Sequence, residues 1–177
     1  MNEFLTYEYV VAPPKRKKLR ALLLLAYALY AIIPLIIFST VGLLFLPLYA
    51  VIPLTLWIVV LLTWPATAPE YEYSMTSGDL TFSVIYGGRR RKKIFETKIK
   101  AMEDIAPNSK MYNHKVEDYR ATKIYDGASS READGAYFAL FENAAGERCV
   151  YYFEPTEKAL KILRHYNPKT VVTKVKF

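Results

Sequence analysis

The amino-acid sequence predicts an α-helical transmembrane hairpin followed by an α+β domain of about seven antiparallel strands and one C-terminal helix. The first observation is that residues 21–64 contain no charged side chain, and 36 of these 44 residues are apolar. The second is that, from residue 70 onward, short alternating runs are separated by turn residues. The overall apolar content of 53% therefore averages two unlike parts. A plain soluble globule, a disordered chain and a disulfide scaffold are all excluded.

The uncharged block has the length of two membrane spans. A helix needs about 20 residues to cross about 30 Å of hydrocarbon. We expect spans at residues 19–38 and 43–64, joined by a turn near residues 39–42 or at Pro47. This divides the chain into an N-terminal segment (1–18), the hairpin (19–64), a domain (70–168) and a tail (169–177).

Five basic residues before the first span predict the orientation. They are Lys15, Arg16, Lys17, Lys18 and Arg20. Basic flanks remain cytoplasmic, so two passes place both termini in the cytoplasm of a multi-pass cell-membrane protein. A signal peptide cleaved near Ala28 or Ala31 is disfavoured because the apolar run continues for more than thirty residues beyond them. A re-entrant hairpin that never crosses would leave both ends on the same side.

The strands of the domain follow from alternation and turn residues. We expect them at residues 71–76, 80–86, 91–100, 101–105, 119–126, 136–142 and 148–154, with a loop at 109–118 and a hairpin turn at 143–147. A helix is expected from Pro155, preceded by Glu154 at the N-cap, to Pro168. Residues 5–11 also alternate, which leaves two outcomes open: an added edge strand or a disordered start.

Three motifs carry a family resemblance. The first strand and turn hold Tyr71, Glu72, Tyr73, Thr76, Gly78 and Leu80, a basic run follows, and the end holds Phe153, Pro155 and Glu157. Seven strands and a C-terminal helix resemble pleckstrin-homology (PH) domains. Residues 15–168 more closely resemble a domain-of-unknown-function family of short bacterial two-span membrane proteins with a C-terminal PH-like domain. The resemblance implies that fold and no specific activity. The acidic turn at residues 77–79 and a helix without Trp do not support specific phosphoinositide binding.

The basic run is the candidate lipid-facing patch. It consists of Arg89, Arg90, Arg91, Lys92 and Lys93. Residues 65–69 span about 17 Å when extended, which holds the domain close to the headgroups. Each basic residue near an anionic bilayer gains about 1 kcal/mol. The alternative is a solvated strand end that serves solubility. Nucleic-acid binding is not expected, because such sites need exposed aromatic side chains beside the basic groups.

No catalytic, cofactor or metal site is expected. Cys149 lies in an apolar strand, His114 and His165 lack metal-ligand spacing, and the adjacent pairs 103–104 and 117–118 suit a charged surface. We therefore expect a membrane-anchored, non-enzymatic binding or scaffolding protein that meets a protein partner or anionic lipid. The alternative is an accessory subunit of a larger membrane complex, recognised through its hairpin. A membrane-bound hydrolase would require a cluster of titratable groups.

Overall fold

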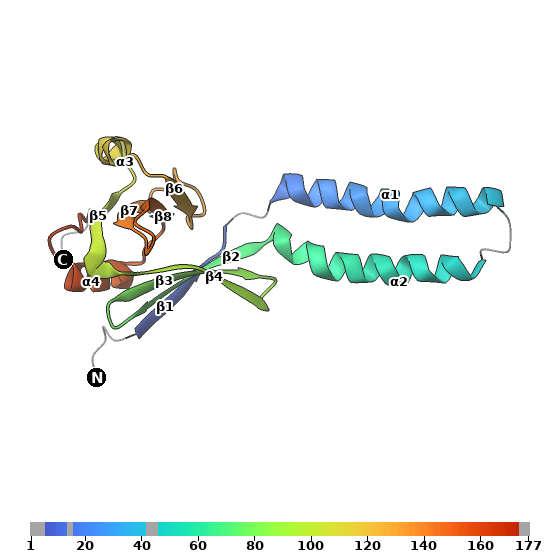
Figure 1. Ribbon diagram of the computed structural model, residues 1–177, viewed down its shortest axis with the longest axis horizontal. Coiled ribbons are helices and arrows are strands. Elements are labelled where there is room, and N and C mark those ends of the chain that lie inside the picture. Colours follow the sequence, from blue (N-terminus) through green and yellow to red (C-terminus); the bar gives the residue numbers. More distant parts are fainter. Residues whose placement is uncertain (1–5, 14–15, 42–45, 174–177) are drawn as a thin grey trace. The chain divides into compact units, whose positions relative to one another are not determined.

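A computed structural model describes residues 6–13, 16–41 and 46–173. The chain forms two compact units. Pro14–Pro69 makes up the helical unit, whereas the strand β1 (Thr6–Val11) and the chain from Glu70 onward make up the other (Figure 1). The helical segment is therefore an insertion into a domain whose sheet is built from both flanks.

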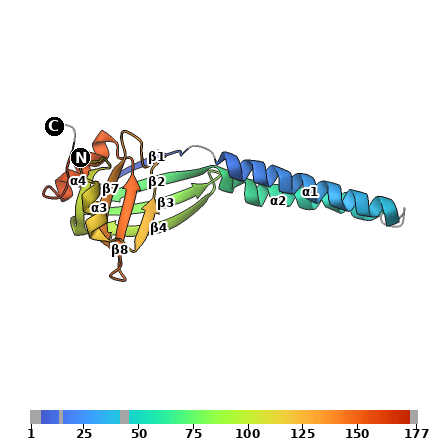
Figure 2. The same cartoon turned by 90° about the horizontal axis from the view of Figure 1, so that it is seen from above.

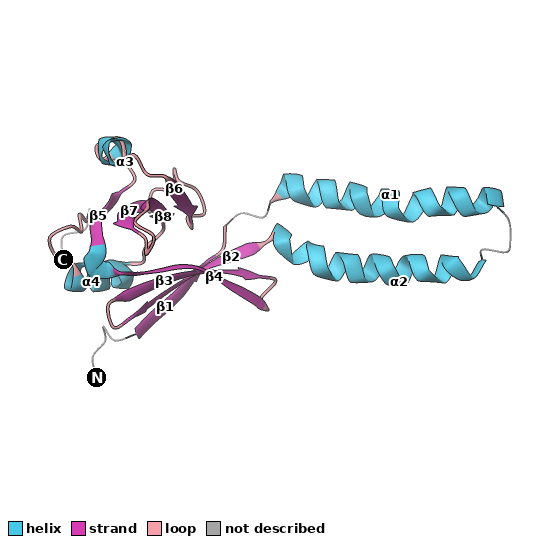
Figure 3. Ribbon diagram, in the orientation of Figure 1, coloured by secondary structure: helices cyan, strands magenta, loops and turns pink. Residues whose placement is uncertain are grey.

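The helical unit contains two long apolar helices. They are α1 (Lys17–Val41) and α2 (Leu46–Thr63), and the short 3₁₀ turn η2 (Trp64–Thr67) follows (Figure 3). Helix α1 extends beyond the expected span 19–38 at both ends, and α2 begins three residues later than expected. The connection between them falls on residues 42–45, outside the described residues.

Tyrosine and threonine hydroxyls join α1 to α2. Tyr27 Oη lies 2.5 Å from Thr63 Oγ1, and Tyr30 Oη lies 2.7 Å from Thr55 Oγ1. Each threonine hydroxyl also donates to a carbonyl of its own helix, at 2.7–2.8 Å. The tyrosines therefore act as the donors between helices. Such pairs satisfy polar groups in an apolar setting, where an unpaired hydroxyl is costly.

Two four-stranded sheets form the domain. The first has the order β1-β2-β3-β4, with β2 at Pro69–Thr76, β3 at Asp79–Tyr86 and β4 at Arg90–Lys98. The second has the order β5-β7-β8-β6, with β5 at Met102–Pro107, β6 at Lys123–Asp126, β7 at Tyr137–Glu142 and β8 at Arg148–Phe153. The strands of the two sheets cross steeply (Figure 2). The expectation of an entirely antiparallel arrangement is wrong at one place, because β6 pairs parallel to β8.

The N-terminal segment forms an edge strand, the first of the two outcomes left open. Strand β1 pairs antiparallel with β2, from Thr6 opposite Thr76 to Val11 opposite Tyr71. The described residues therefore contain eight strands rather than seven. Inward-facing Tyr7, Tyr9 and Val11 pack against the core, which explains why this strand is held in place.

The core lies between the sheets and beneath helix α4 (Glu157–Tyr166). Its largest fully buried side chains include Tyr73, Phe82, Phe141, Tyr151 and Phe153, and α4 adds Ala159, Leu160, Ile162 and Leu163. The expected start of this helix was wrong. Thr156 is the N-cap, since its Oγ1 accepts a hydrogen bond from the Ala159 amide at 3.2 Å. Threonine is the better cap, because its short side chain reaches this amide.

The expected loop at residues 109–118 contains a short helix, α3 (Asn113–Tyr119). It covers the outer face of the second sheet, where Tyr112, Val116 and Tyr119 pack on a second buried cluster around Phe138 and Val150. The expected strand 119–126 is accordingly shortened to Lys123–Asp126. The spacing 112, 116, 119 is helical, but no side chain caps the helix N-terminus. Its sequence signal was therefore weak.

Two further connections close the domain. The predicted turn at 143–147 is confirmed: Asn143 Oδ1 accepts hydrogen bonds from the amides of Ala145 and Glu147, and Gly146 has a φ of +74°. After α4, Val172 donates to the Ile105 carbonyl at 2.8 Å, and the Ile105 amide donates to Thr170. Part of the expected tail therefore covers the edge of β5. Residues 174–177 lie outside the described residues.

Candidate functional site

The basic run occupies the β3–β4 turn and the first half of β4. Tyr86 pairs with Arg90, and residues 87–89 form the turn between them. Gly87 and Gly88 both have positive φ, at 59° and 67°, which glycine adopts without steric cost. All five basic side chains of the run are exposed.

Strand register assigns these cations to two faces of the first sheet. Arg91 and Lys93 lie opposite Ile85 and Ser83, on the face that points away from the core. Arg90 and Lys92 lie opposite Tyr86 and Val84, and both of those side chains pack with the core. The β3–β4 turn lies beyond the strands of the second sheet (Figures 1 and 2), so these two cations remain in solvent.

Ion pairs within the domain neutralise two of the five cations. Arg91 Nη2 lies 2.5 Å from Glu72 Oε1, and this pair joins the outermost strand to β2 across β3. The Glu72 side chain is 8% exposed, whereas that of Arg91 is 61% exposed. Lys93 pairs with Glu96 on its own strand.

The other three cations of the run have no ion pair within the described residues. Arg89, Arg90 and Lys92 have no acidic partner in the part of the chain that the structure describes. The sequence located the run, but it could not show that Arg91 is paired, because its partner Glu72 is nineteen residues away.

A β-bulge separates the basic half of β4 from its core half. Phe82 pairs with Phe95 and Ser83 with Lys93, so Ile94 is the extra residue. Phe95 is buried, and Ile94 packs against the core. Bulges bend a strand and increase its twist. Here the bulge marks the point at which β4 leaves the core and continues as an exposed basic strand.

The unpaired cations share one end of the first sheet with both connections to the helices. The last residue of β1, Val11, lies opposite Tyr71 near the start of β2. Only Ser77 and Gly78 join β2 to β3, and so short a connection makes these strands antiparallel. The start of β2 therefore lies beside the end of β3 and the β3–β4 turn. We call this end the connection end of the first sheet.

The residues expected to set the orientation lie at the start of α1. Lys15 is outside the described residues, and Arg16, Lys17 and Lys18 are exposed. Arg20 donates from Nε to Thr67 Oγ1 at 3.2 Å, and its guanidinium lies 5.3 Å from the ring centroid of Trp64. The Arg16 amide also donates to the Thr67 carbonyl at 3.1 Å. Arg20 and Trp64 thus form a cation–π pair within the helical unit.

A tyrosine stack links β1 to the core, and sequence reasoning missed it. The rings of Tyr9 and Tyr73 are stacked at 4.5 Å between centroids, and Tyr73 donates its hydroxyl to the Gly127 carbonyl. Tyr151 stacks on Phe153 at 5.1 Å. Burial raises the pKa of Tyr9, Tyr73 and Tyr151 above the usual value for tyrosine. The repeated Tyr-Glu-Tyr at residues 7–9 and 71–73 was the available signal, because these segments pair.

The acidic pair Glu103–Asp104 holds α3 in place. Tyr119 donates to Glu103 at 2.9 Å, and Lys115 pairs with Asp104. Neighbouring residues of a regular strand face opposite sides, but here the register shifts between Met102 and Asp104. Both carboxylates therefore reach the same helix.

The remaining candidate residues are scattered. Cys149 is buried, and this burial raises the pKa of its thiol. His114 and His165 are exposed, on α3 and α4 respectively. No three His, Cys, Asp or Glu side chains within residues 6–13, 16–41 and 46–173 lie close enough together to hold a metal ion.

Comparison with known proteins places the chain in a family. No curated protein and no solved structure matches it. The model of one protein family, described as a bacterial PH-like domain (DUF6106), matches residues 3–173. This match includes β1, both long helices, both sheets and α4. The chain therefore belongs to the bacterial PH-like domain family DUF6106.

Proposed function

We propose that this protein is a membrane-anchored, non-enzymatic binding module. Helices α1 and α2 cross the cell membrane, both termini are cytoplasmic, and the PH-like domain meets anionic lipid headgroups at the membrane surface. One observation carries the proposal. Three cations without an acidic partner in the described part of the chain (Arg89, Arg90 and Lys92) lie at the connection end of the first sheet, from which the chain continues into two apolar helices.

The exposure of the helices supports the anchor. Lys17–Ile37 and Ala50–Thr67 are long and apolar enough to cross a membrane. In the most apolar 18-residue stretch of each, 0% and 6% of the residues respectively are buried. A core helix of a soluble protein with this composition would be mostly buried. Helices that expose most of their apolar side chains are typical of an environment of lipid.

The pairing of β1 with β2 supports an even number of crossings. Val11 and Tyr71 lie opposite each other in one sheet, although the two helices separate them in sequence. Both ends of the helical insertion must therefore lie on the same side of the membrane. A signal peptide cleaved near Ala28 would detach β1 from the domain. The exposed Arg16, Lys17 and Lys18 favour the cytoplasm for that side.

The charge available to lipid is smaller than the basic run suggests. Arg91 and Lys93 already have carboxylate partners, which leaves three cations. At about 1 kcal/mol for each, they contribute about 3 kcal/mol to contact with an anionic surface. This is enough to orient a tethered domain, and salt weakens it.

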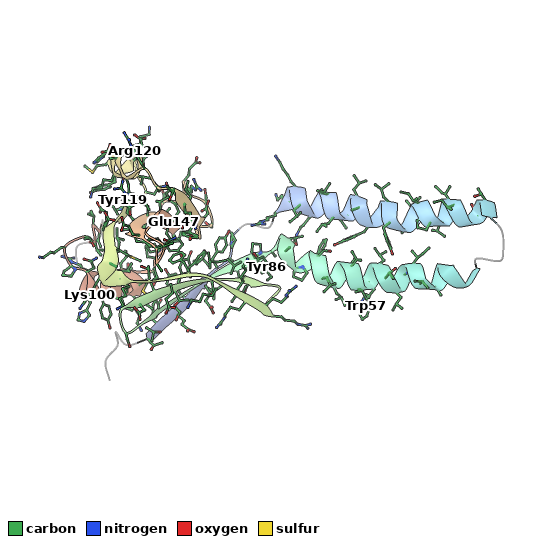
Figure 4. All side chains as sticks on the ribbon, in the orientation of Figure 1. Trp57, Tyr86, Lys100, Tyr119, Arg120 and Glu147 are labelled. Atoms are coloured by element: carbon green, nitrogen blue, oxygen red, sulfur yellow. The ribbon has the colours of Figure 1, made fainter. Side chains whose placement is uncertain are left out.

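Hydrogen exchange of the full chain in nanodiscs tests the lipid contact. We expect amides of the β3–β4 turn to exchange more slowly in discs of phosphatidylcholine with phosphatidylserine than in phosphatidylcholine alone. The triple variant R89A/R90A/K92A should abolish the difference, and K100A should retain it. In Figure 4, Lys100 and Tyr86 lie at opposite ends of the domain, which makes Lys100 a matched control. Equal exchange in both discs would contradict the lipid contact.

Labelling of cysteines in intact cells tests the topology. The variants Asn2→Cys and Ser130→Cys, each combined with Cys149→Ser, should resist a thiol reagent that cannot cross the membrane. Both should react after permeabilisation. Labelling of either variant from outside would overturn the cytoplasmic assignment.

One observation favours a second candidate, an accessory subunit recognised through its hairpin. Trp57 is 62% exposed and lies in the interior of α2 rather than at its end. It points away from α1 (Figure 4). Tryptophan normally favours the membrane interface, so this position suits contact with another helix. A photoreactive amino acid at position 57 should capture a membrane protein under this alternative, whereas one at position 89 should not.

A further inference from the structure

Strand β4 presents a long open edge. It is the outermost strand of the first sheet and pairs only with β3 within the described part of the chain. By contrast, residues after α4 cover part of the edge of β5, and β6 is only four residues long. An open edge exposes unpaired amide and carbonyl groups along its length, and these can accept another strand.

Charge is divided sharply between β4 and the rest of its sheet. Strands β1, β2 and β3 carry four carboxylates (Glu8, Glu70, Glu72 and Asp79) and no Lys or Arg. Strand β4 carries Arg90, Arg91, Lys92, Lys93 and Lys98 against the single Glu96. On the closed side, residues 90–93 lie opposite uncharged residues of β3, and Asp79 lies opposite Lys98 at the other end of the strand. Only Glu72 of β2 reaches the basic half, through Arg91. A strand added at the open edge could place carboxylates directly beside the cations that have no partner within the described residues.

We propose that the free edge of β4 binds an extended acidic peptide segment by strand addition, with contact concentrated at residues 90–93. The strand-addition proposal rests on the proposed function only in assuming that the protein is a binding module. It assigns a peptide partner to the same basic strand. Backbone hydrogen bonds would supply affinity, and carboxylates opposite the basic side chains would supply selectivity.

The paired and unpaired cations predict where the acidic side chains lie. On the outer face, Arg91 and Lys93 are already engaged by Glu72 and Glu96. On the other face, Arg90 and Lys92 are exposed and have no carboxylate partner among the residues that the structure describes. Alternate residues of an added strand share one face, so the carboxylates of the bound segment should lie on the face of Arg90 and Lys92. The bulge at Ile94 limits a straight pairing to the basic half.

The same charges disfavour another copy of β4 as the partner. Two β4 edges side by side would place several cations opposite cations, which is destabilising. Strand β1 also has an open edge, but among its described residues it offers only Glu8 as a carboxylate. A segment with several carboxylates in alternation matches β4 better.

Fluorescence anisotropy with a synthetic peptide tests the proposal. The full chain is placed in nanodiscs of phosphatidylcholine, which is neutral, and a labelled eight-residue peptide of alternating Glu and Val is titrated. We expect saturable binding that the matching Lys–Val peptide does not show. Two N-methylated peptides, modified at all Glu or at all Val positions, remove donors from opposite edges. One of them should lose binding and the other retain it.

Variants of the chain complete the test. R90E/K92E should weaken binding of the acidic peptide by about tenfold or more, because attraction becomes repulsion. K100E should leave binding unchanged. Equal binding of the two N-methylated peptides would show charge attraction without strand addition and would overturn the proposal. No binding, or self-association that excludes the peptide, would also overturn it. These discs contain no anionic lipid, so the result is independent of the lipid-contact experiment.

Discussion

The two units of this protein use the same apolar residue types in opposite ways. In the helical unit, Leu22 is 63% exposed and Leu54 is 57% exposed, whereas Leu80 in the domain is fully buried. The domain is stabilised by burying its apolar side chains in its own core. The helical unit instead leaves many of its apolar side chains exposed on the surface of α1 and α2. Composition alone cannot distinguish an exposed apolar helix from a buried core. The periodicity of the apolar residues and the positions of the charged residues can distinguish them.

The largest expected difference between the two units is in their stability at high pH. Burial raises the pKa of Tyr9, Tyr73 and Tyr151. Unfolded tyrosines ionise near pH 10, so the stabilisation is fully present below pH 10 and is lost as the pH rises above it. Each buried tyrosine then costs about 1.4 kcal/mol per pH unit. Near-ultraviolet circular dichroism should show the domain unfolding above pH 10, while the helical signal of α1 and α2 persists. Coincident loss of both signals would contradict independent units.

Leucine truncation should sharpen the contrast at single residues. Leu80→Ala should lower the free energy of unfolding by about 2–5 kcal/mol, because it leaves a cavity in the core. Leu54→Ala should change this free energy by less than about 0.5 kcal/mol, because the Leu54 side chain is exposed and its removal leaves no cavity in a packed core. Thermal unfolding of the full chain in nanodiscs measures both. Similar costs for the two variants would show that the hairpin packs like a core.

The ion pair across the first sheet should have an intermediate effect. Arg91→Ala leaves the nearly buried carboxylate of Glu72 without its partner and should cost about 1–2 kcal/mol, discounted because Arg91 is itself exposed. Lys93→Ala removes an exposed pair and should cost less than about 0.5 kcal/mol. Chemical denaturation of the two variants provides the comparison. Equal costs would mean that the burial of Glu72 is unimportant.

The smallest expected difference in stability is between variants that remove one of two buried tyrosine hydroxyls. Tyr73 donates to the Gly127 carbonyl, so Tyr73→Phe should lower stability by about 1 kcal/mol. The buried Tyr9 hydroxyl has no hydrogen-bond partner among the described residues, so Tyr9→Phe should be neutral or slightly stabilising. The midpoints of thermal unfolding distinguish the two outcomes. A larger loss from Tyr9→Phe would reveal a partner for that hydroxyl.

Local pattern predicted the parts of the fold that have strong local signals. The uncharged block gave two helices, and the alternation from Leu80 to Tyr86 gave β3 with its inward residues. The short α3 was missed because it lacks a side-chain cap, and the parallel pairing of β6 was missed because register between distant strands leaves no local mark. The basic run was located correctly, but the pairing of Arg91 with Glu72 depends on β3 lying between them. Sequence periodicity does not determine which distant strands or side chains pair with each other.

The placement of β1 has a consequence for biosynthesis. During translation β1 emerges well before its partner, because Tyr71 follows Val11 by sixty residues and both helices lie between them. The first strand must therefore remain without its partner β2 until both helices have been synthesised. Long sequence separation slows such a closure. Under the proposed topology, completion of the first sheet depends on correct insertion, because a chain whose helices fail to return to the starting side cannot join β1 to β2. Tyr7 and Tyr9 would then lose their contact with the core.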